Sequence, residues 1–230
     1  MKTKTTKNKL GLLALLGLLW TSSALSNDIY IEQSGDNLTL SVTQEGTSNE
    51  VGNSTTGVSL TGDDMDLTIS QVGNTNTVEM SVTGDNYTGN IDVSGSSNTT
   101  TVNCDSVGAG NCGTVTNTLT LTGNSNTLTL NVGENDDASD SNITYSVTGS
   151  SNTITGTVDG TNVTASTTIS GSTNTHDVTI SGGGVSGHSL THSHTGGLGS
   201  FTLNQSGIND TTVNLNTSGD NHNVTITVTD

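Results

Sequence analysis

Apolar and polar residues alternate along this chain in short runs that are separated by glycine-containing turns. In the segment 68–86, TISQVGNTNTVEMSVTGDN, most alternate positions on either side of Gly73 are apolar, Gln or Asn, and Ser, Thr or Glu fill most positions between them. Such alternation is typical of β-strands with one buried and one exposed face. Gly73 is followed eleven residues later by Gly84, so one strand and one turn together take eleven residues.

This eleven-residue interval extends over nearly the whole chain. If the last inward position of each strand is taken as a marker, there are seventeen units, and eleven of the sixteen steps between them are eleven residues long. The other five steps are longer by one to six residues, and four of these five follow an odd-numbered unit. The markers are Gln33, Gln44, Leu60, Gln71, Val82, Val93, Cys104, Leu121, Val132, Val147, Val158, Ile169, Ile180, His194, Gln205, Thr217 and Val228.

A regular repeat whose insertions gather on one side is typical of a solenoid. We therefore predict an all-β fold, a β-solenoid of stacked two-strand coils with about 11 residues per strand and 22 per coil. Composition alone would favour disorder, because the chain has one Phe, three Tyr and one Trp, too few large side chains for a globular core. The periodicity argues against disorder.

The first residues have the features of a secretory signal peptide. A basic stretch with four lysines precedes an apolar run from Leu10 to Trp20, and small residues end the segment at Ser26. The apolar run is too short to span a membrane, and no longer one follows. We expect residues 1–26 to be removed and residues 27–230 to form one solenoid domain, secreted to the extracellular space or the bacterial cell surface, without membrane insertion.

Removal of this leader would leave a chain without any Lys or Arg. All four lysines lie within it and all 21 acidic residues follow it, so the mature net charge would be −21. Such a chain is poorly suited to nucleic acid or an anionic membrane. Cations, basic partners, a sugar surface and simple solvation all stay open.

Three segments resemble curlin repeats: IYIEQSGDN (29–37), VTQEGTSNEV (42–51) and ISQVGNTNTV (69–78). The family pattern has Gln two residues before a Gly and Asn three residues after it. Curlin subunits are secreted bacterial proteins that stack two-strand coils into amyloid fibres of the biofilm matrix. The resemblance implies self-association, a nucleator or an outer-membrane export partner, and stacking ladders formed by Gln33, Gln44, Gln71, Gln205, Asn49, Asn76, Asn98, Asn126, Asn152 and Asn174.

Assembly is also expected from the physics of stacked coils. Terminal coils present unpaired strand edges, and the predicted mature chain lacks the Pro and Lys residues that often block such edges. The alternative is a monomeric solenoid that acts as a surface adhesin or an ice-binding protein. Recurrent Thr-x-Thr pairs such as Thr127 and Thr129 suggest the second role, although Thr is also a favourable exposed strand residue.

Two cysteines and five histidines are further candidates. Cys104 and Cys112 are predicted to form a disulfide across a short insertion. The histidines His188, His192 and His194 fall on inward positions, as do His176 and His222. They either form a weak transition-metal site or replace amides as polar interior groups, in which case protonation near pH 6 would loosen this end of the stack.

The segment 133–140, GENDDASD, contains Glu134, Asp136 and Asp137, which form either a weak calcium site or a solvated loop. We predict no other cofactor. No spacing couples a nucleophile to a base, and the basic and aromatic groups of a polysaccharide-cleaving groove are lacking. We therefore expect that the protein is not an enzyme.

Overall fold

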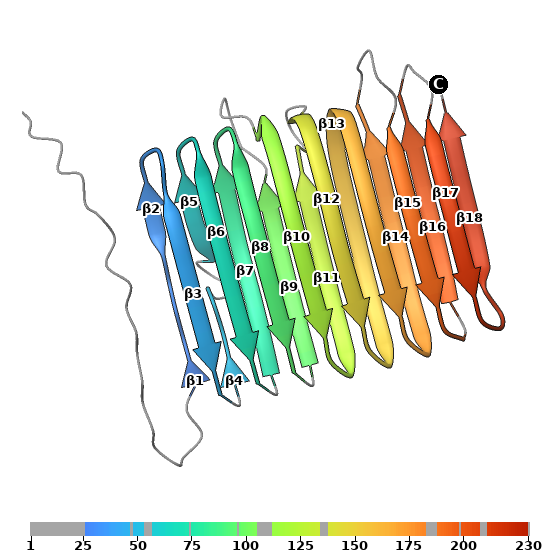
Figure 1. The fold of residues 1–230 in the computed structure, drawn as a ribbon, viewed down its shortest axis with the longest axis horizontal. Coiled ribbons are helices and arrows are strands. Elements are labelled where there is room, and N and C mark those ends of the chain that lie inside the picture. Colours follow the sequence, from blue (N-terminus) through green and yellow to red (C-terminus); the bar gives the residue numbers. More distant parts are fainter. Residues whose placement is uncertain are drawn as a thin grey trace, which may run out of the picture.

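The protein is a parallel β-solenoid (Figure 1). A computed structural model describes residues 26–46, 48–52, 57–73, 75–95, 97–104, 112–133, 138–182, 188–197, 199–207 and 211–229. All regular elements in these ranges are β-strands, as predicted. The predicted signal peptide, apart from Ser26, lies outside the described residues.

The strands form two sheets, and each coil contributes one strand position to each sheet. Sheet A contains β1 (Ser26–Asn27), β2 (Glu32–Ser34), β4 (Ser48–Asn49), β5 (Val58–Thr61), β7 (Thr75–Thr83), β9 (Ser97–Cys104), β11 (Ser125–Val132), the first half of β13 (Ser151–Ser170), β14 (Thr173–Ser181), β16 (Gly199–Ser206) and β18 (Asn223–Thr229). Sheet B contains β3 (Thr39–Glu45), β6 (Met65–Val72), β8 (Tyr87–Ser94), β10 (Thr114–Thr122), β12 (Ala138–Thr148), the second half of β13, β15 (Ser189–Thr195) and β17 (Thr212–Ser218).

Every described strand pairing is parallel, and equivalent residues of successive coils lie side by side. Leu60 pairs with Val82 and Val82 with Cys104, so these coils advance by the expected 22 residues. Cys104 then pairs with Val132, because the intervening coil carries an insertion. As several coils are lengthened in this way, the solenoid has about seven turns with roughly 25 residues per turn, more than the uniform 22 that the sequence suggested.

The core lies between the two sheets and is made of columns of stacked inward side chains. Residues alternate between buried and exposed along the strands, as in β6 and β9. One column of sheet B runs through Ile69, Ile91 and Leu119, and all three side chains are at least 99 % buried. Narrow columns of this kind need few aromatic residues, so the polar composition is compatible with a continuous core.

Four of the five insertions lie where the chain passes from sheet A to sheet B. This agrees with their position after odd-numbered units in the sequence. The fifth insertion, which follows Gln44, interrupts a strand of sheet A instead. Val51 pairs with Val78, whereas Val58 pairs with Met80, so the chain takes seven steps where the neighbouring strand takes two, and five extra residues interrupt the strand between Val51 and Gly57. The marker spacing did not locate this insertion, because markers occur only once per strand.

The opposite edge, where the chain returns from sheet B to sheet A, is regular and contains a glycine in each turn. A Cβ atom on Gly73 would lie 1.9 Å from the carbonyl oxygen of Gly46, and one on Gly95 would lie 1.7 Å from that of Gly73. Because the turns stack this closely, a side chain cannot be accommodated there. The recurrent glycine of the sequence repeat is therefore a steric requirement of coil stacking.

Candidate assembly site: interior ladders and open coil ends

An asparagine ladder runs along the regular edge of the solenoid. The six asparagines at the position three residues after the turn glycine are all buried, and they occupy one column of sheet A. Asn76 donates from Nδ2 to Oδ1 of Asn49 over 2.8 Å, and Asn98 donates to Asn76 over 2.6 Å. Stacked amides of this kind stabilise adjacent coils through buried hydrogen bonds.

The ladder consists of two runs whose amide hydrogen bonds are donated in opposite directions along the stack. In the second run, Asn126 donates to Asn152 over 2.8 Å and Asn152 to Asn174 over 2.6 Å, so each residue donates toward the C-terminus. The two runs meet at Asn98 and Asn126, whose Oδ1 atoms are buried without a hydrogen-bond partner. This junction is the weakest link of the column, because it leaves two acceptors unsatisfied.

Beyond Asn174 the column continues through histidines. Gly199 occupies the next position of sheet A, and the ring of His194 from sheet B fills the space that a side chain would take. Asn174 donates from Nδ2 to Nε2 of His194 over 2.6 Å. The ring of His222 follows at a centroid distance of 4.6 Å, and both of its nitrogen atoms are shielded from solvent and have no hydrogen-bond partner.

The glutamines form a shorter ladder than the resemblance implied. Gln71 donates from Nε2 to Oε1 of Gln44 over 2.7 Å in sheet B. Gln33 and Gln205 lie in sheet A, where Gln33 pairs with Leu60, and Gln205 with Ile180 and Val228. No glutamine lies beside either of them, because the strand order places their repeats on the other sheet from Gln44 and Gln71.

His176 and His192 lie inside the C-terminal coils and contact aromatic residues. The ring of His192 stacks on Phe201 with centroids 4.2 Å apart, and its Nδ1 lies 2.6 Å from the hydroxyl oxygen of Thr167. The Tyr145 hydroxyl forms a hydrogen bond with Nε2 of His176, whose ring lies 4.7 Å from that of His192. The inward position of the histidines was predicted from the sequence, but their aromatic and hydroxyl partners were not, because the members of this cluster come from five strands in different coils.

Burial keeps these imidazoles neutral. Desolvation and, to a smaller extent, the neighbouring His194 lower the pKa of His192 to about 4. Desolvation likewise lowers the pKa of His176 well below 6.5, with contributions from His192 and His194. His188 is also buried, and its Nδ1 accepts from the backbone N–H of Val163 over 3.3 Å. This arrangement fits polar interior groups.

The other predicted sites are only partly described. Cys104 and Cys112 form a disulfide, and both are buried at the edge where the chain passes from β9 to β10. Within the described ranges, no three His, Cys, Asp or Glu residues lie close enough to hold a metal ion. Glu134, Asp136 and Asp137 lie outside the described residues, so the calcium site stays a prediction.

The C-terminal end of the solenoid is open. In the described part of the chain, β18 pairs only with β16, and β17 only with β15. The inward residues Val224, Ile226 and Val228 of β18 are 37 %, 41 % and 47 % exposed. An edge strand with a row of exposed aliphatic side chains is a template for further strand pairing.

The N-terminal end presents a complementary surface. Its inward residues Ile29 and Ile31 of sheet A are only partly buried, although they pack against the core. In sheet B, β3 has its neighbour β6 on one side, and no described strand covers the other side. In the described part of the chain, both ends of the stack therefore combine an edge strand with partly exposed apolar side chains.

Comparison with protein-family models, curated proteins and solved structures finds no match for this chain. In the ranges that the structure describes, no helix has the length and apolarity needed to cross a membrane. The ladders and the coil ends are therefore the features from which we infer function.

Proposed function

We propose that this protein is a secreted structural subunit that assembles end to end, by coil stacking, into amyloid-like extracellular fibres of a biofilm matrix or cell surface. The role is mechanical and not catalytic. The C-terminal coil of one copy pairs with the N-terminal coil of the next. An export or nucleation partner at the outer membrane remains part of the proposal, on the resemblance to curlin repeats alone.

The observation that carries this proposal is the match between the two ends of three interior columns. Glu32 pairs with Ser59, so Ile31 lies beside Val58, and successive pairings lead from Val58 to Ile226 at the other end. A copy stacked in register would therefore place Ile31 on Ile226. Both side chains are partly exposed in the isolated chain and would be buried by the contact.

Two columns of sheet B match in the same way. The column that begins at Leu40 ends at Val213, and the column that begins at Val42 ends at Leu215. Aliphatic side chains thus stand at both ends of three columns. The junction between copies would then have the composition of the interior, with backbone pairing in both sheets.

Electrostatic repulsion opposes this assembly. The described residues include no Lys or Arg, since the chain has none after Lys9, and 21 acidic residues follow that position. Copies therefore repel one another until salt screens the charge. At about 0.15 M salt the Debye length is about 8 Å, so the repulsion between exposed charges that are farther apart is largely removed. Calcium is expected to have the same effect at lower concentration.

The test is incubation of residues 27–230, with the disulfide oxidised, at low ionic strength with a chelator, in about 0.15 M salt, and with calcium. We expect unbranched fibres that bind thioflavin and seed fresh monomer in the two screened conditions, with much slower growth in the first. A folded monomer that persists in all three conditions would contradict the proposed assembly.

A second candidate, ice binding by the monomer, is favoured by the outer face of sheet A. Two neighbouring outward columns are Thr in three successive coils, on β9, β11 and β13. They are formed by Thr99 and Thr101, Thr127 and Thr129, and Thr153 and Thr155. Thr-x-Thr pairs occur on both sheets, as at Thr118 and Thr120 of β10, so the sequence pattern alone did not show this regularity.

An ice-recrystallisation assay separates the two functions. Thr129→Tyr would break the array on sheet A, whereas Thr120→Tyr on β10 alters the opposite face. Ice binding predicts inhibition of recrystallisation that only the first variant abolishes. No inhibition by the wild-type monomer would exclude this candidate.

A further inference from the structure

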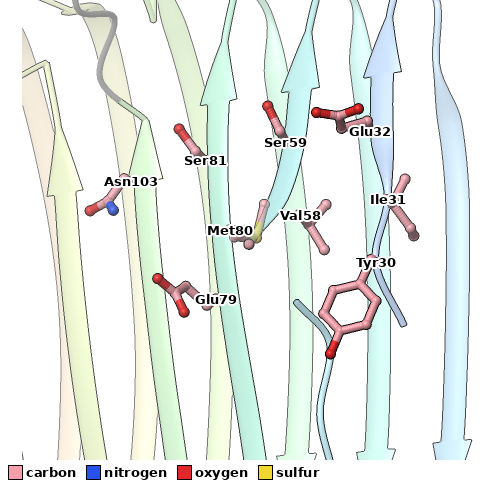
Figure 2. Close-up of a pocket in the computed structure, with 10 residues that line it drawn as sticks. Tyr30, Ile31, Glu32, Val58, Ser59, Glu79, Met80, Ser81 and Asn103 are labelled. Atoms are coloured by element: carbon pink, nitrogen blue, oxygen red, sulfur yellow. The ribbon is translucent and has the colours of Figure 1, made fainter. Parts of the chain in front are cut away.

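A hollow of about 600 Å³ opens beside sheet A near the N-terminal end of the solenoid (Figure 2). It is lined by residues from the starts of the first coils, including Tyr30 just before β2, and by residues of β5, β7 and β9. Its volume falls within the range of sites that hold small organic ligands. Its walls contain acidic, hydroxyl and aromatic groups, which differ from the Thr-rich surface farther along the same face.

The strand register explains why the sheet is hollowed here. Tyr30, Gly57 and Glu79 occupy one outward row, because their neighbours Ile31, Val58 and Met80 stand side by side within the sheet. Gly57 contributes no side chain, so a notch is left between the Tyr30 ring and the Glu79 carboxylate. A Cβ at Gly57 would lie 2.9 Å from the carbonyl oxygen of Glu79, which disfavours any larger residue.

A second outward row forms the other side of the hollow. Glu32 pairs with Ser59, Ser59 with Ser81, and Ser81 with Asn103. Figure 2 shows the Glu32 carboxylate and the two serines along one level of the strands, with Tyr30 and Glu79 at another. The two rows are two residues apart along the strands, about 7 Å, and Tyr30 and Glu79 are two strand spacings apart, about 10 Å.

The chemistry of these rows restricts the ligand. The Tyr30 side chain is 52 % exposed and offers a flat apolar face. Glu32 and Glu79 provide two carboxylates, and no Lys or Arg follows residue 9 to neutralise them. An anionic ligand is therefore repelled. The hydroxyls of Ser59 and Ser81 suit a ligand with several hydroxyl groups spread over this area.

We propose that this hollow binds an amino sugar, as a free oligosaccharide or as part of a polymer. One pyranose ring stacks on Tyr30, ammonium groups of different sugar residues pair with Glu79 and with Glu32, and the hydroxyl groups bond to the serines. A simple metal ion would not use the aromatic face, and a single ammonium group would not span both rows. The site faces outward, so it is accessible whether or not the chain assembles.

The test is calorimetric titration of freshly dissolved residues 27–230 with a glucosamine oligomer at about pH 6, where its amine is protonated. Three variants accompany the wild type: Tyr30→Ala, Glu79→Gln and the matched control Asp177→Asn. Asp177 lies in the same outward row as Glu79 but in β14, far along the stack, so its replacement removes the same charge outside the hollow. Melting curves establish that each variant is folded.

We expect binding that weakens about tenfold or more in Glu79→Gln and about threefold to tenfold in Tyr30→Ala, with Asp177→Asn unchanged. The fully N-acetylated oligomer, which lacks the charge, should bind at least tenfold more weakly. Equal binding of the acetylated oligomer would overturn the proposal. So would equal weakening in Asp177→Asn, or an oligolysine peptide that binds as tightly and independently of Tyr30, because either result would indicate diffuse attraction to an acidic surface.

Discussion

Asn174 donates its side-chain amide to Nε2 of His194, and this hydrogen bond joins a column of sheet A to a residue of sheet B. Nε2 accepts only when it carries no proton, so the bond requires a neutral imidazole. The absence of a side chain at Gly199 makes the contact possible, since the His194 ring occupies that space. The C-terminal coils are thus held together by groups whose bonding depends on pH.

Acidification is expected to destabilise the C-terminal coils. The pKa of His192 is lowered to about 4 and that of His176 lies well below 6.5, whereas both are near 6.5 in the unfolded chain. The unfolded state therefore binds protons that the folded state excludes. Stability is full above about pH 6.5 and is lost as the pH falls through the folded-state values, by on the order of 3 kcal/mol for His192.

Urea denaturation from about pH 7.5 to pH 4 tests this expectation. The control is the double variant His192→Leu with Thr167→Val, which removes the titrating ring together with the hydroxyl that contacts it. Protonation of the carboxylates affects both proteins alike. The wild type should lose stability more steeply than the control, and parallel curves would show that the folded state does not exclude the proton from His192.

Loss of a ladder amide is expected to destabilise the fold more than loss of a surface amide. Asn152→Ala removes the acceptor for Asn126 and the donor for Asn174, and it leaves buried polar atoms unpaired. We expect a decrease in unfolding free energy of about 2–4 kcal/mol. Asn131→Ala breaks a half-buried amide pair with Asn103 and should decrease it by less than about 1 kcal/mol. Similar losses in chemical denaturation would argue against a structural ladder.

Two glycines should respond in opposite ways to a single methyl group. In Gly171→Ala, the new Cβ would lie 1.9 Å from the carbonyl oxygen of Gly149 in the stacked turn. In Gly156→Ala, the nearest atom is Cγ2 of Val178 at 3.9 Å, an ordinary contact. Thermal unfolding should show a clear loss of stability in the first variant. The second should be neutral or gain about 0.4–1 kcal/mol, because alanine restricts the unfolded chain. A well-tolerated Gly171→Ala would contradict the close stacking of turns.

The sequence was sufficient to predict the solenoid and its asparagine column, because both depend on spacing alone. A residue three positions after a turn glycine must fall at the same place in every coil, so Asn76 and Asn98 were predictable neighbours. Gln33 does not stack on a glutamine, because two-strand coils place its odd-numbered unit on the other sheet from the even-numbered units of Gln44 and Gln71.

Features that depend on the third dimension were not predictable. His194 lies at the position of its strand where other strands of sheet B carry a glutamine. Its ring nevertheless enters the asparagine column, because Gly199 on the facing sheet leaves a space. The hollow beside Tyr30 depends on an insertion that interrupts a strand of sheet A and returns at Gly57, which a count of intervals could not locate.

The most direct test of end-to-end assembly is the effect of Ile226→Lys on seeded growth. This substitution puts a charge at the inward, exposed end of a column, whereas the control Thr202→Lys adds the same charge on the outward side of β16. An Ile226→Lys monomer can still add its intact N-terminal coil to a fibre, and it then blocks further addition.

Small amounts of Ile226→Lys added to wild-type monomer and seeds should therefore slow elongation far more than the dilution of wild-type monomer would. The pure variant should not form fibres. Thr202→Lys should elongate at nearly the wild-type rate. If Ile226→Lys forms fibres as fast as the control, or inhibits only in proportion to its dilution of wild-type monomer, the C-terminal coil is not the growing surface and the proposed assembly is wrong.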